Sequence, residues 1–368
     1  METAIVAIGT ANPAYRQQQQ EAAELIATVL NLNPAEKRLL KSVYKATGIE
    51  YRYSVMSDFC STPDELRLFP REPEAPFPST AVRMQVYKEN ALKLALLAIE
   101  NCLAMLDSFD KSKITHLITI SCTGMYAPGI DIEIIQTLGL NSTTQRTMVN
   151  FMGCYAAFSG MKLADAICKA NPDANVLIVS VELCTIHFQK SMRPDNMISN
   201  AIFADGAAAV LFQAKPTQKK YFNIKSFYCD LLPQTNQEMA WHITDYGFDM
   251  VLSSYVPKMI ESGIADFVDK LLTQSGTVLS AIDLYAIHPG GLKILQACEK
   301  ALNIDQEQNK YSYQIMRNYG NMSSATILFT LKAIWEDISH LDNNKNIFSC
   351  AFGPGLTLES MLLQIQEA

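Results

Sequence analysis

The sequence predicts an α/β protein in which helices cover both faces of the sheet. Runs of apolar, β-branched residues have the length of strands, longer segments have helical spacing, and the two kinds alternate along the chain. Continuous apolar strands are typical of buried sheets, since a solvated face would show alternating polar residues. The expected strands are 114–120, 176–181, 207–212, 283–287 and 347–352, and the clearest expected helices are 86–106 and 255–272.

The composition fits a fully folded protein. The 368 residues are 49% hydrophobic and 18% charged, and this length exceeds one ordinary small core, so two fused halves are expected. The net charge of −7 argues against nucleic acid as a partner, because binding phosphates needs a basic surface. The apolar run 4–8 follows no basic segment and predicts a first strand, and no apolar stretch is long enough to cross a bilayer. We therefore expect a cytoplasmic protein.

A weak internal repeat relates the two expected halves. A strand runs into a glycine-bearing turn at 122–124, and another does so at 288–291. A second glycine corner follows later in each half, at 152–154 and at 352–355. Because open α/β sheets keep their sites at strand ends, these four corners are expected to lie near one another.

The polar stretch 213–237 is interpreted as the seam between the halves. The prediction is therefore an N-terminal half over residues 1–213 and a C-terminal half over residues 214–368. The only low-complexity run, Gln17-Gln18-Gln19-Gln20, predicts the solvated start of a helix.

The cysteine pattern excludes a disulfide framework and a zinc knuckle. The number of cysteines is odd, their spacings are scattered, and no C-x-x-C pair occurs. Most of them are expected to be small buried residues in a reducing compartment. The nine are Cys60, Cys102, Cys122, Cys154, Cys168, Cys184, Cys229, Cys298 and Cys350.

Cys154 is the candidate nucleophile. The segment 149–152 is expected to be extended, Gly153 allows a tight turn, and residues 155–170 have the pattern of a buried helix. A cysteine at a helix N-terminus is favoured as a thiolate by the helix dipole and the unpaired N–H groups. The alternative is that Cys154 is simply a small residue at a crowded turn.

His288 and Asn321 are the expected partners of this cysteine. His288 ends a buried strand and is followed by Pro289-Gly290-Gly291, whose glycines allow a ligand to approach closely. A histidine there can take a proton from a thiol. Asn321 follows Gly320 and is placed to cap a helix over 323–338, which is also its alternative, purely structural role.

Together these motifs resemble the thiolase-fold condensing enzymes, and among them the type III polyketide synthases related to chalcone synthase. The resemblance covers nearly the whole chain, from Gly9-Thr10-Ala11-Asn12-Pro13 to the glycine loop Gly353-Pro354-Gly355. Gly153-Cys154 matches the family's nucleophile turn, His288-Pro289-Gly290-Gly291 its histidine motif, and Gly320-Asn321-Met322-Ser323-Ser324-Ala325 its asparagine motif. The implied fold is thiolase-like, with two pseudo-repeated βαβ halves forming a layered αβαβα core.

The resemblance implies a reaction and a division of roles. Cys154 would accept an acyl group from an acyl-CoA starter, while His288 and Asn321 would stabilise the enolate formed when malonyl-CoA loses carbon dioxide. Metal and organic cofactors are not expected, because CoA thioesters are the only reactants. The family is homodimeric and passes a residue before a proline into the neighbouring subunit. Here that pair is Ala127-Pro128, for which a cis peptide bond is expected.

The resemblance also implies a reaction cavity. Three of its residues depart from the plant pattern. Trp241 replaces a glycine and should block part of the elongation cavity, and Met250 replaces a second aromatic gatekeeper. His187 replaces a small hydroxyl residue and is either a wall or a second proton donor. The matching residues are Cys122, Thr123, Glu182, Cys184, His187, Ser199, Phe203, Met239, Trp241, Met250 and Ser323.

The CoA phosphates require cations. Lys37, Arg38, Lys41 and Lys45 recur at helical spacing, and the family places its CoA-binding basic residues in this region. Lys41 and Lys45 are the candidates, and a solvated helix face is the alternative reading.

The segment 182–189 is similar to bacterial alkylpyrone, alkylresorcinol and tetrahydroxynaphthalene synthases, which favours an acyl-CoA starter and a pyrone or resorcinol product. Two rival functions remain at this point. One is a ketoacyl-carrier-protein synthase III-type enzyme, and the other is a non-catalytic partner subunit. The intact cysteine, histidine and asparagine argue against the second.

Overall fold

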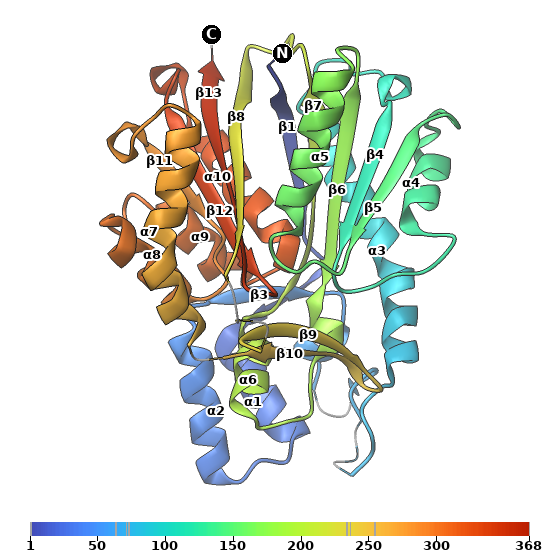
Figure 1. Ribbon diagram of the computed structural model, residues 1–368. Helices are drawn as coiled ribbons and strands as arrows, with labels where there is room; N and C mark the ends of the chain where they lie inside the picture. The colour runs from blue at the N-terminus through green and yellow to red at the C-terminus, as the bar shows by residue number, and fades with distance from the viewer. Residues whose placement is uncertain are drawn as a thin grey trace.

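The strands of the computed structural model form one large mixed sheet, flanked by two short antiparallel pairs (Figure 1). The structure describes residues 2–367 except 63, 64, 71, 73, 233, 234, 236 and 254. Across the nine-stranded sheet the order is β11 (Leu284–Ile287), β12 (Asn346–Gly353), β13 (Thr357–Glu367), β8 (Lys220–Leu231), β1 (Ala4–Ala11), β7 (Asp205–Gln213), β6 (Asn175–Leu183), β4 (His116–Ser121) and β5 (Gln145–Asn150).

Helices lie in three layers around this sheet. Helix α3 (Thr80–Leu103) packs on β1, β7 and β6, and α5 (Ala156–Ala170) covers the other face of β4, β6 and β7. Helix α10 (Thr326–Asp337) shares the central layer with α5, and α7 (Val256–Gln274) packs on β8 and β13 with α8 (Leu292–Leu302) beside it. Strands β1 and β8 pair over only two residues, Ala4 with Asn223 and Ile5 with Phe222, and the strands on either side of this short junction supply the two β layers of the expected thiolase-like αβαβα order.

The alternation of side chains along each strand explains the layers. In β6, Val176 and Ile178 join the central core, whereas Leu177 and Val179 join the core beneath α3. Successive residues of a strand point to opposite faces, so an apolar strand supplies two cores at once. Each strand buried in this way requires helices on both of its faces.

The predicted elements correspond closely to the observed ones. The expected strands become β4, β6, β7, β11 and β12, each with its ends shifted by a few residues. The expected helices become α3 and α7, and the helix predicted at 155–170 is α5. The helix predicted at 323–338 opens with a 3₁₀ turn over Ser323–Ala325 before α10 begins.

One end of the sheet is closed by smaller elements. The hairpin of β9 (Met239–Thr244) and β10 (Gly247–Leu252) crosses beneath this end, and α1 (Gln19–Val29), α2 (Pro34–Ala46) and α6 (Pro194–Ile202) lie below it (Figure 1). The two chain termini lie at the opposite end (Figure 1). The carboxyl ends of β4, β5 and β6 therefore open toward a covered space.

The glutamine run was predicted as a solvated helix start, and only part of it is one. Gln17 and Gln18 belong to β2 (Tyr15–Gln18), which pairs with β3 (Tyr51–Ser54), and α1 begins only at Gln19. Gln19 is 1% exposed and its amide donates to the carbonyl of Ala201 at 2.7 Å. A tertiary hydrogen bond thus holds Gln19 inside the protein, whereas Gln18 and Gln20 are exposed.

Candidate active site

The four glycine corners predicted from the sequence do meet at the covered end of the sheet. The Cys122 sulfur accepts a hydrogen bond from Gly153 N at 3.0 Å, which joins the first two corners. A Cβ built on Gly153 would lie 2.4 Å from Pro354 Cδ, so only glycine permits this contact. The His288 N–H donates to Cys350 O at 2.8 Å, which brings the histidine turn to the end of β12.

Cys154 lies immediately before α5, as predicted. Gly153 has a φ of 87°, a left-handed conformation that glycine adopts without strain, and Tyr155 is the N-cap. The thiol is 8% exposed and faces a small closed chamber. Burial is the main cause that raises its pKa to about 12, and hydrogen bonds with Ser323 and Asn321 partly oppose the shift.

His288 is the least satisfied buried group near this cysteine. Its side chain is 1% exposed, and no described residue forms a hydrogen bond with either ring nitrogen. Buried polar atoms are normally paired, so an orphaned imidazole indicates a position meant for a ligand or a transferred proton. Burial lowers its pKa to about 3, which keeps the ring neutral in the empty site.

Asn321 connects the histidine to the cysteine. Its Oδ1 accepts from Ser323 N at 2.9 Å at the start of the 3₁₀ turn, although the N-cap positions are Met322 for that turn and Ala325 for α10, and not Asn321 as predicted. Its amide Nδ2 is only weakly engaged, with Gly290 O 3.4 Å away. The amide hydrogens are therefore held beside both the histidine turn and the Cys154 thiol, with little competition from the protein.

The raised pKa of Cys154 favours the neutral thiol, and the lowered pKa of His288 favours the neutral imidazole. Each shift is the cost of burying one charge by itself, whereas proton transfer from thiol to imidazole creates two opposite charges together. Attraction between those charges offsets much of the burial cost. The arrangement suits a nucleophile that ionises when a substrate enters.

The chamber beside Cys154 is lined by residues predicted for the reaction cavity. Its volume is about 20 Å³, roughly the space of one water molecule. Besides the nucleophile, the predicted residues that line it are Cys122, Thr123, Cys184, Phe203, Met239, Trp241, Met250, Ser323 and Pro354.

Glu182 lies behind this chamber rather than in its lining. The Cys122 N–H donates to both carboxylate oxygens, at 3.2 and 3.0 Å, and the Thr123 hydroxyl donates at 2.8 Å. The Ser324 hydroxyl also donates to it, and this partner was missed although it adjoins the predicted Ser323. Burial raises the pKa of Glu182 to about 7 in spite of these donors.

Both ring nitrogens of His187 are hydrogen-bonded to the protein, which favours the wall among the two roles considered from the sequence. Its Nε2 donates to Thr123 O at 2.7 Å, and its Nδ1 accepts from Phe248 N at 3.0 Å. The ring stacks on Phe248 with centroids 4.1 Å apart. Both nitrogens are thus engaged, and burial lowers the pKa of the ring to about 3, so it stays neutral.

His187 and Ser199 line a second small cavity on the far side of Trp241. This cavity shares Cys184, Phe203, Trp241 and Met250 with the chamber of Cys154, so those side chains form a partition. Ser199 donates its hydroxyl to Asp195 O at 2.6 Å, within its own helix. Two of the predicted pocket residues therefore lie one layer away from the nucleophile.

An apolar cavity of about 260 Å³ opens to the surface beside the histidine turn. Helix α2 contributes Val43, Ala46 and Thr47 to it, whereas Lys41 bonds with Glu24 of α1. The face of α2 that lines the cavity is thus not the face of Lys41. Lys293, two residues after the histidine motif, is exposed and lines the cavity, and it was not among the residues predicted from the sequence.

The glycine loop and the predicted cis bond are both present. Gly353 ends β12, and a Cβ on it would lie 2.4 Å from the ring of Tyr155, so the loop packs against the start of α5. The Ala127-Pro128 bond is cis, as predicted.

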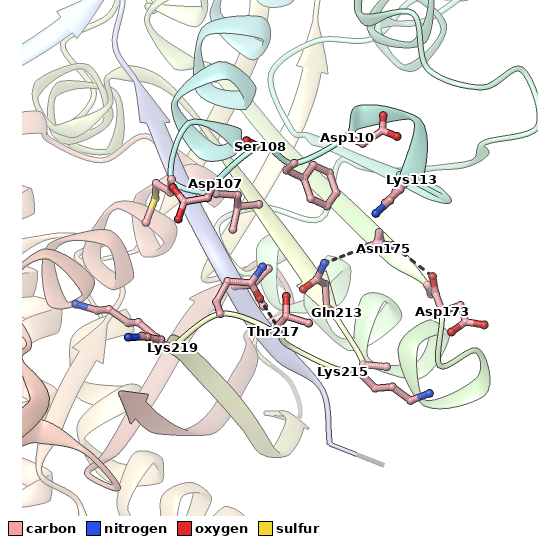
Figure 2. A pocket seen from close by; sticks show the side chains of 18 of the residues that line it. Asp107, Ser108, Asp110, Lys113, Asp173, Asn175, Gln213, Lys215, Thr217 and Lys219 are labelled. Atoms are coloured by element: carbon pink, nitrogen blue, oxygen red, sulfur yellow. Dashed lines mark hydrogen bonds between the residues drawn. The ribbon is translucent and has the colours of Figure 1, made fainter. Parts of the chain in front are cut away.

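A cavity of about 870 Å³ lies at the other end of the sheet (Figure 2). It surrounds Asn175 at the start of β6 and Gln213 at the end of β7, which are hydrogen-bonded at 2.6 Å. Its charged rim mixes Lys113, Lys215 and Lys219 with aspartates (Figure 2). None of the predicted site residues lies there. In the described part of the chain, no helix is long and apolar enough to cross a membrane.

Comparison with protein-family models places both halves of the chain in one family. The model for the N-terminal domain of chalcone and stilbene synthases matches residues 2–216, and the model for the C-terminal domain matches residues 223–366. The two matched segments together cover nearly all of the chain.

Individual relatives agree with the family models. The chain is 30% identical to the α-pyrone synthesis polyketide synthase-like Pks18 of Mycobacterium tuberculosis, over 98% of this chain and 91% of that protein. It is 28% identical to a putative chalcone synthase of Bacillus subtilis, covering 99% of each chain. Among solved structures, the C-terminal type III polyketide synthase domain of Steely1 from Dictyostelium superposes with a TM-score of 0.90 at 29% identity, covering 100% of both chains.

Proposed function

The chain belongs to the chalcone and stilbene synthase family, and from this premise we propose that Cys154, His288 and Asn321 perform its chemistry. The protein is a type III polyketide synthase, an acyltransferase that carries out decarboxylative Claisen condensation of malonyl-CoA. What we propose concerns the residue roles, the starter, the product and the assembly.

One observation supports the residue roles above the others. His288 is buried with both ring nitrogens free of described partners, at the turn next to the weakly engaged Asn321 amide. Leaving a buried donor unpaired costs about 1–3 kcal/mol, and a role in the reaction would account for that cost at His288.

In the loading step, His288 takes the proton of Cys154 as the sulfur attacks the acyl-CoA carbonyl. The new thioester bond forms, the carbon–sulfur bond to CoA breaks, and His288 returns the proton to the departing CoA thiolate. The N-terminus of α5 favours negative charge on the sulfur during this step.

In the extension step, the thioester oxygen of malonyl-CoA lies between His288 and the Asn321 amide. Loss of carbon dioxide places negative charge on that oxygen, and both groups donate hydrogen bonds to it. The enolate carbon attacks the acyl carbonyl on Cys154, and the Cys154 thiolate leaves. The reaction needs no metal and no organic cofactor, because the carboxylate itself supplies the electron pair.

The apolar cavity beside Gly290 is the proposed route for the thioester arm of CoA. Its lining suits the uncharged arm, and it ends at the histidine turn. Of the basic residues near it, Lys293 is exposed at the cavity and is our candidate for the CoA phosphates. Lys45, a residue of α2, remains a second candidate, whereas Lys41 is engaged with Glu24.

We propose an acyl-CoA starter and a small pyrone or resorcinol product. The closed chamber and its Trp241 partition favour few extensions, since each adds two carbons to the enclosed chain. The M. tuberculosis relative is named for α-pyrone synthesis, which agrees with this choice.

A homodimer is the proposed assembly. Strand β5 is an edge of the sheet, and most of its residues are exposed, including Met148 at 37%. An unpaired edge presents free backbone groups with which another chain can pair. A second copy would also bring its Ala127-Pro128 corner toward this site. The cytoplasm is the proposed location.

The test is to incubate the purified protein with malonyl-CoA and acyl-CoAs of graded length, and to identify the products by mass. Wild type should yield pyrones or resorcinols, and Cys154→Ala should yield none. Acyl-carrier-protein thioesters are tested in parallel. If only those support condensation, the substrate proposal is wrong and a ketoacyl-carrier-protein synthase III-type reaction replaces it.

A further inference from the structure

Three cysteines lie at the carboxyl ends of three adjacent parallel strands. Cys122 directly follows β4, Cys184 directly follows β6, and Cys154 follows β5 after a short turn. Strand β4 pairs with both neighbours in parallel, so Cys122 occupies the central position. Neighbouring strands are about 4.8 Å apart, which brings the three thiols into one small region. All three line the same closed chamber.

Cys122 is the thiol most closely tied to the nucleophile. Its sulfur lies 3.0 Å from Gly153 N and 3.4 Å from Gly153 O. The Gly153 carbonyl carbon is bonded to the Cys154 nitrogen, so the Cys122 sulfur contacts the peptide unit that leads into the nucleophile. Among the described residues, no hydrogen bond joins Cys184 to the nucleophile turn. Because its sulfur contacts this turn directly, Cys122 is the better-placed partner for a disulfide with Cys154.

A proton acceptor for Cys122 is already in place. The Glu182 carboxylate receives the Cys122 N–H and also contacts its thiol. Burial and this carboxylate raise the pKa of Cys122, so the thiol stays protonated until a neighbouring group accepts its proton. The Cys122 thiol can pass its proton to the Glu182 carboxylate as the sulfur reacts, so a free Cys122 thiolate need not form first.

We propose that Cys122 and Cys154 form a modification site, in which peroxide converts the nucleophile into a reversible Cys122–Cys154 disulfide. Hydrogen peroxide first oxidises the Cys154 thiol to a sulfenic acid, as the O–O bond breaks and water leaves. The Cys122 sulfur then attacks the Cys154 sulfur, a sulfur–sulfur bond forms, and hydroxide leaves as water with the Cys122 proton. The two cysteines are together oxidised by two electrons, and one peroxide is reduced to two waters.

The chamber volume agrees with this chemistry. A space of about 20 Å³ admits a molecule little larger than water, which peroxide is. The disulfide protects the nucleophile, because a sulfenic acid with no thiol beside it is oxidised further to the irreversible sulfinic acid.

The experiment treats the full-length protein with stepwise hydrogen peroxide, blocks free thiols with iodoacetamide, and maps cysteines by non-reducing mass spectrometry. In wild type we expect a peptide pair linked through Cys122 and Cys154, and activity that returns on adding dithiothreitol. Cys122→Ser should give no linked pair, should accumulate sulfinic Cys154, and should stay inactive after dithiothreitol. Cys184→Ser is the matched control and should give the same Cys122–Cys154 linked pair as wild type. Each activity is compared with that of the same untreated variant.

Three outcomes would overturn the proposal. They are a link between Cys154 and Cys184, sulfinic Cys154 without any linked pair in wild type, and recovery of Cys122→Ser to the wild-type extent. The mass readout requires no turnover, so it remains decisive even if the proposed polyketide products are not found.

Discussion

The indole N–H of Trp241 donates to the carbonyl of Cys122 at 3.0 Å, and this bond ties the β9–β10 hairpin to the end of β4. His187 connects the same two segments, because its Nε2 donates to Thr123 O and its Nδ1 accepts from Phe248 N. The β9–β10 hairpin is thus held, directly and through His187, to the carbonyls of two adjacent residues, Cys122 and Thr123. The same loop is anchored from behind by Glu182.

Replacing Trp241 should lengthen the products. Trp241→Gly removes the partition between the chamber of Cys154 and the cavity behind it, so more extensions should fit before release. Product masses with one acyl-CoA starter measure the change. Trp241→Phe keeps most of the volume without the N–H and serves as the control. An unchanged product range in Trp241→Gly would show that the partition does not limit extension.

His187→Phe should destabilise the protein without removing a step of catalysis. The aromatic ring can still stack on Phe248, but Thr123 O and Phe248 N lose their buried partners, at about 1–3 kcal/mol for each group. Urea unfolding measures the loss, and His340→Phe, at an exposed histidine, is the control. A stable variant that had lost condensation would instead support a chemical role for His187.

Asn321→Ala should separate loading from extension. Loss of one donor to a developing oxyanion typically lowers the rate by about 10²–10³. Release of carbon dioxide from malonyl-CoA should fall by this factor, while the acyl-enzyme on Cys154, detected by intact mass, should still form. Equal losses in both steps would mean that Asn321 mainly shapes the turn before α10.

The stability of the fold should depend on pH through Glu182. Burial raises the pKa of this carboxyl from 4.5 to about 7, so the folded state binds the proton more tightly than the unfolded chain. The stability held by the neutral carboxyl is complete below about pH 4.5 and is lost as the pH rises through about 7. Relative to wild type, Glu182→Gln should gain on the order of 3 kcal/mol across this window. The free energy of unfolding in urea is measured for both proteins across this pH window. If it changed with pH equally in both, the raised pKa of Glu182 would be contradicted.

Lys293 should matter more than Lys41 for CoA binding. Lys293→Ala removes a cation at the apolar cavity, and the KM for malonyl-CoA should rise about 2–5-fold at low salt. Lys41→Ala breaks a surface pair with Glu24 and should leave the KM nearly unchanged. If Lys41→Ala raised the KM and Lys293→Ala did not, the CoA phosphates would instead bind at the face of α2 that carries Lys41.

The sequence predicted the corners of the site because glycine and proline mark them. Gly153 and the glycines after His288 indicate turns whatever the rest of the fold does, and Cys154 and Asn321 follow from their place beside such turns. The strands were predictable for a similar reason, since apolar runs of that length have few alternatives.

Other features depend on which surfaces come together, and local patterns do not contain that information. The basic face of α2 was visible in the sequence, but only packing shows that Glu24 of α1 receives Lys41. His187 could be placed in the cavity region, but its two hydrogen bonds come from segments far apart in the chain. Gln19 is buried for the same reason, through its bond to Ala201.

The close contact between Gly153 and Pro354 joins the N-terminal and C-terminal halves of the chain beside Cys154. In the proposed mechanism one half supplies Cys154 and the other supplies His288 and Asn321, so neither half would be an enzyme by itself. Activity from separately expressed halves would therefore require that they reassociate through the shared central layer.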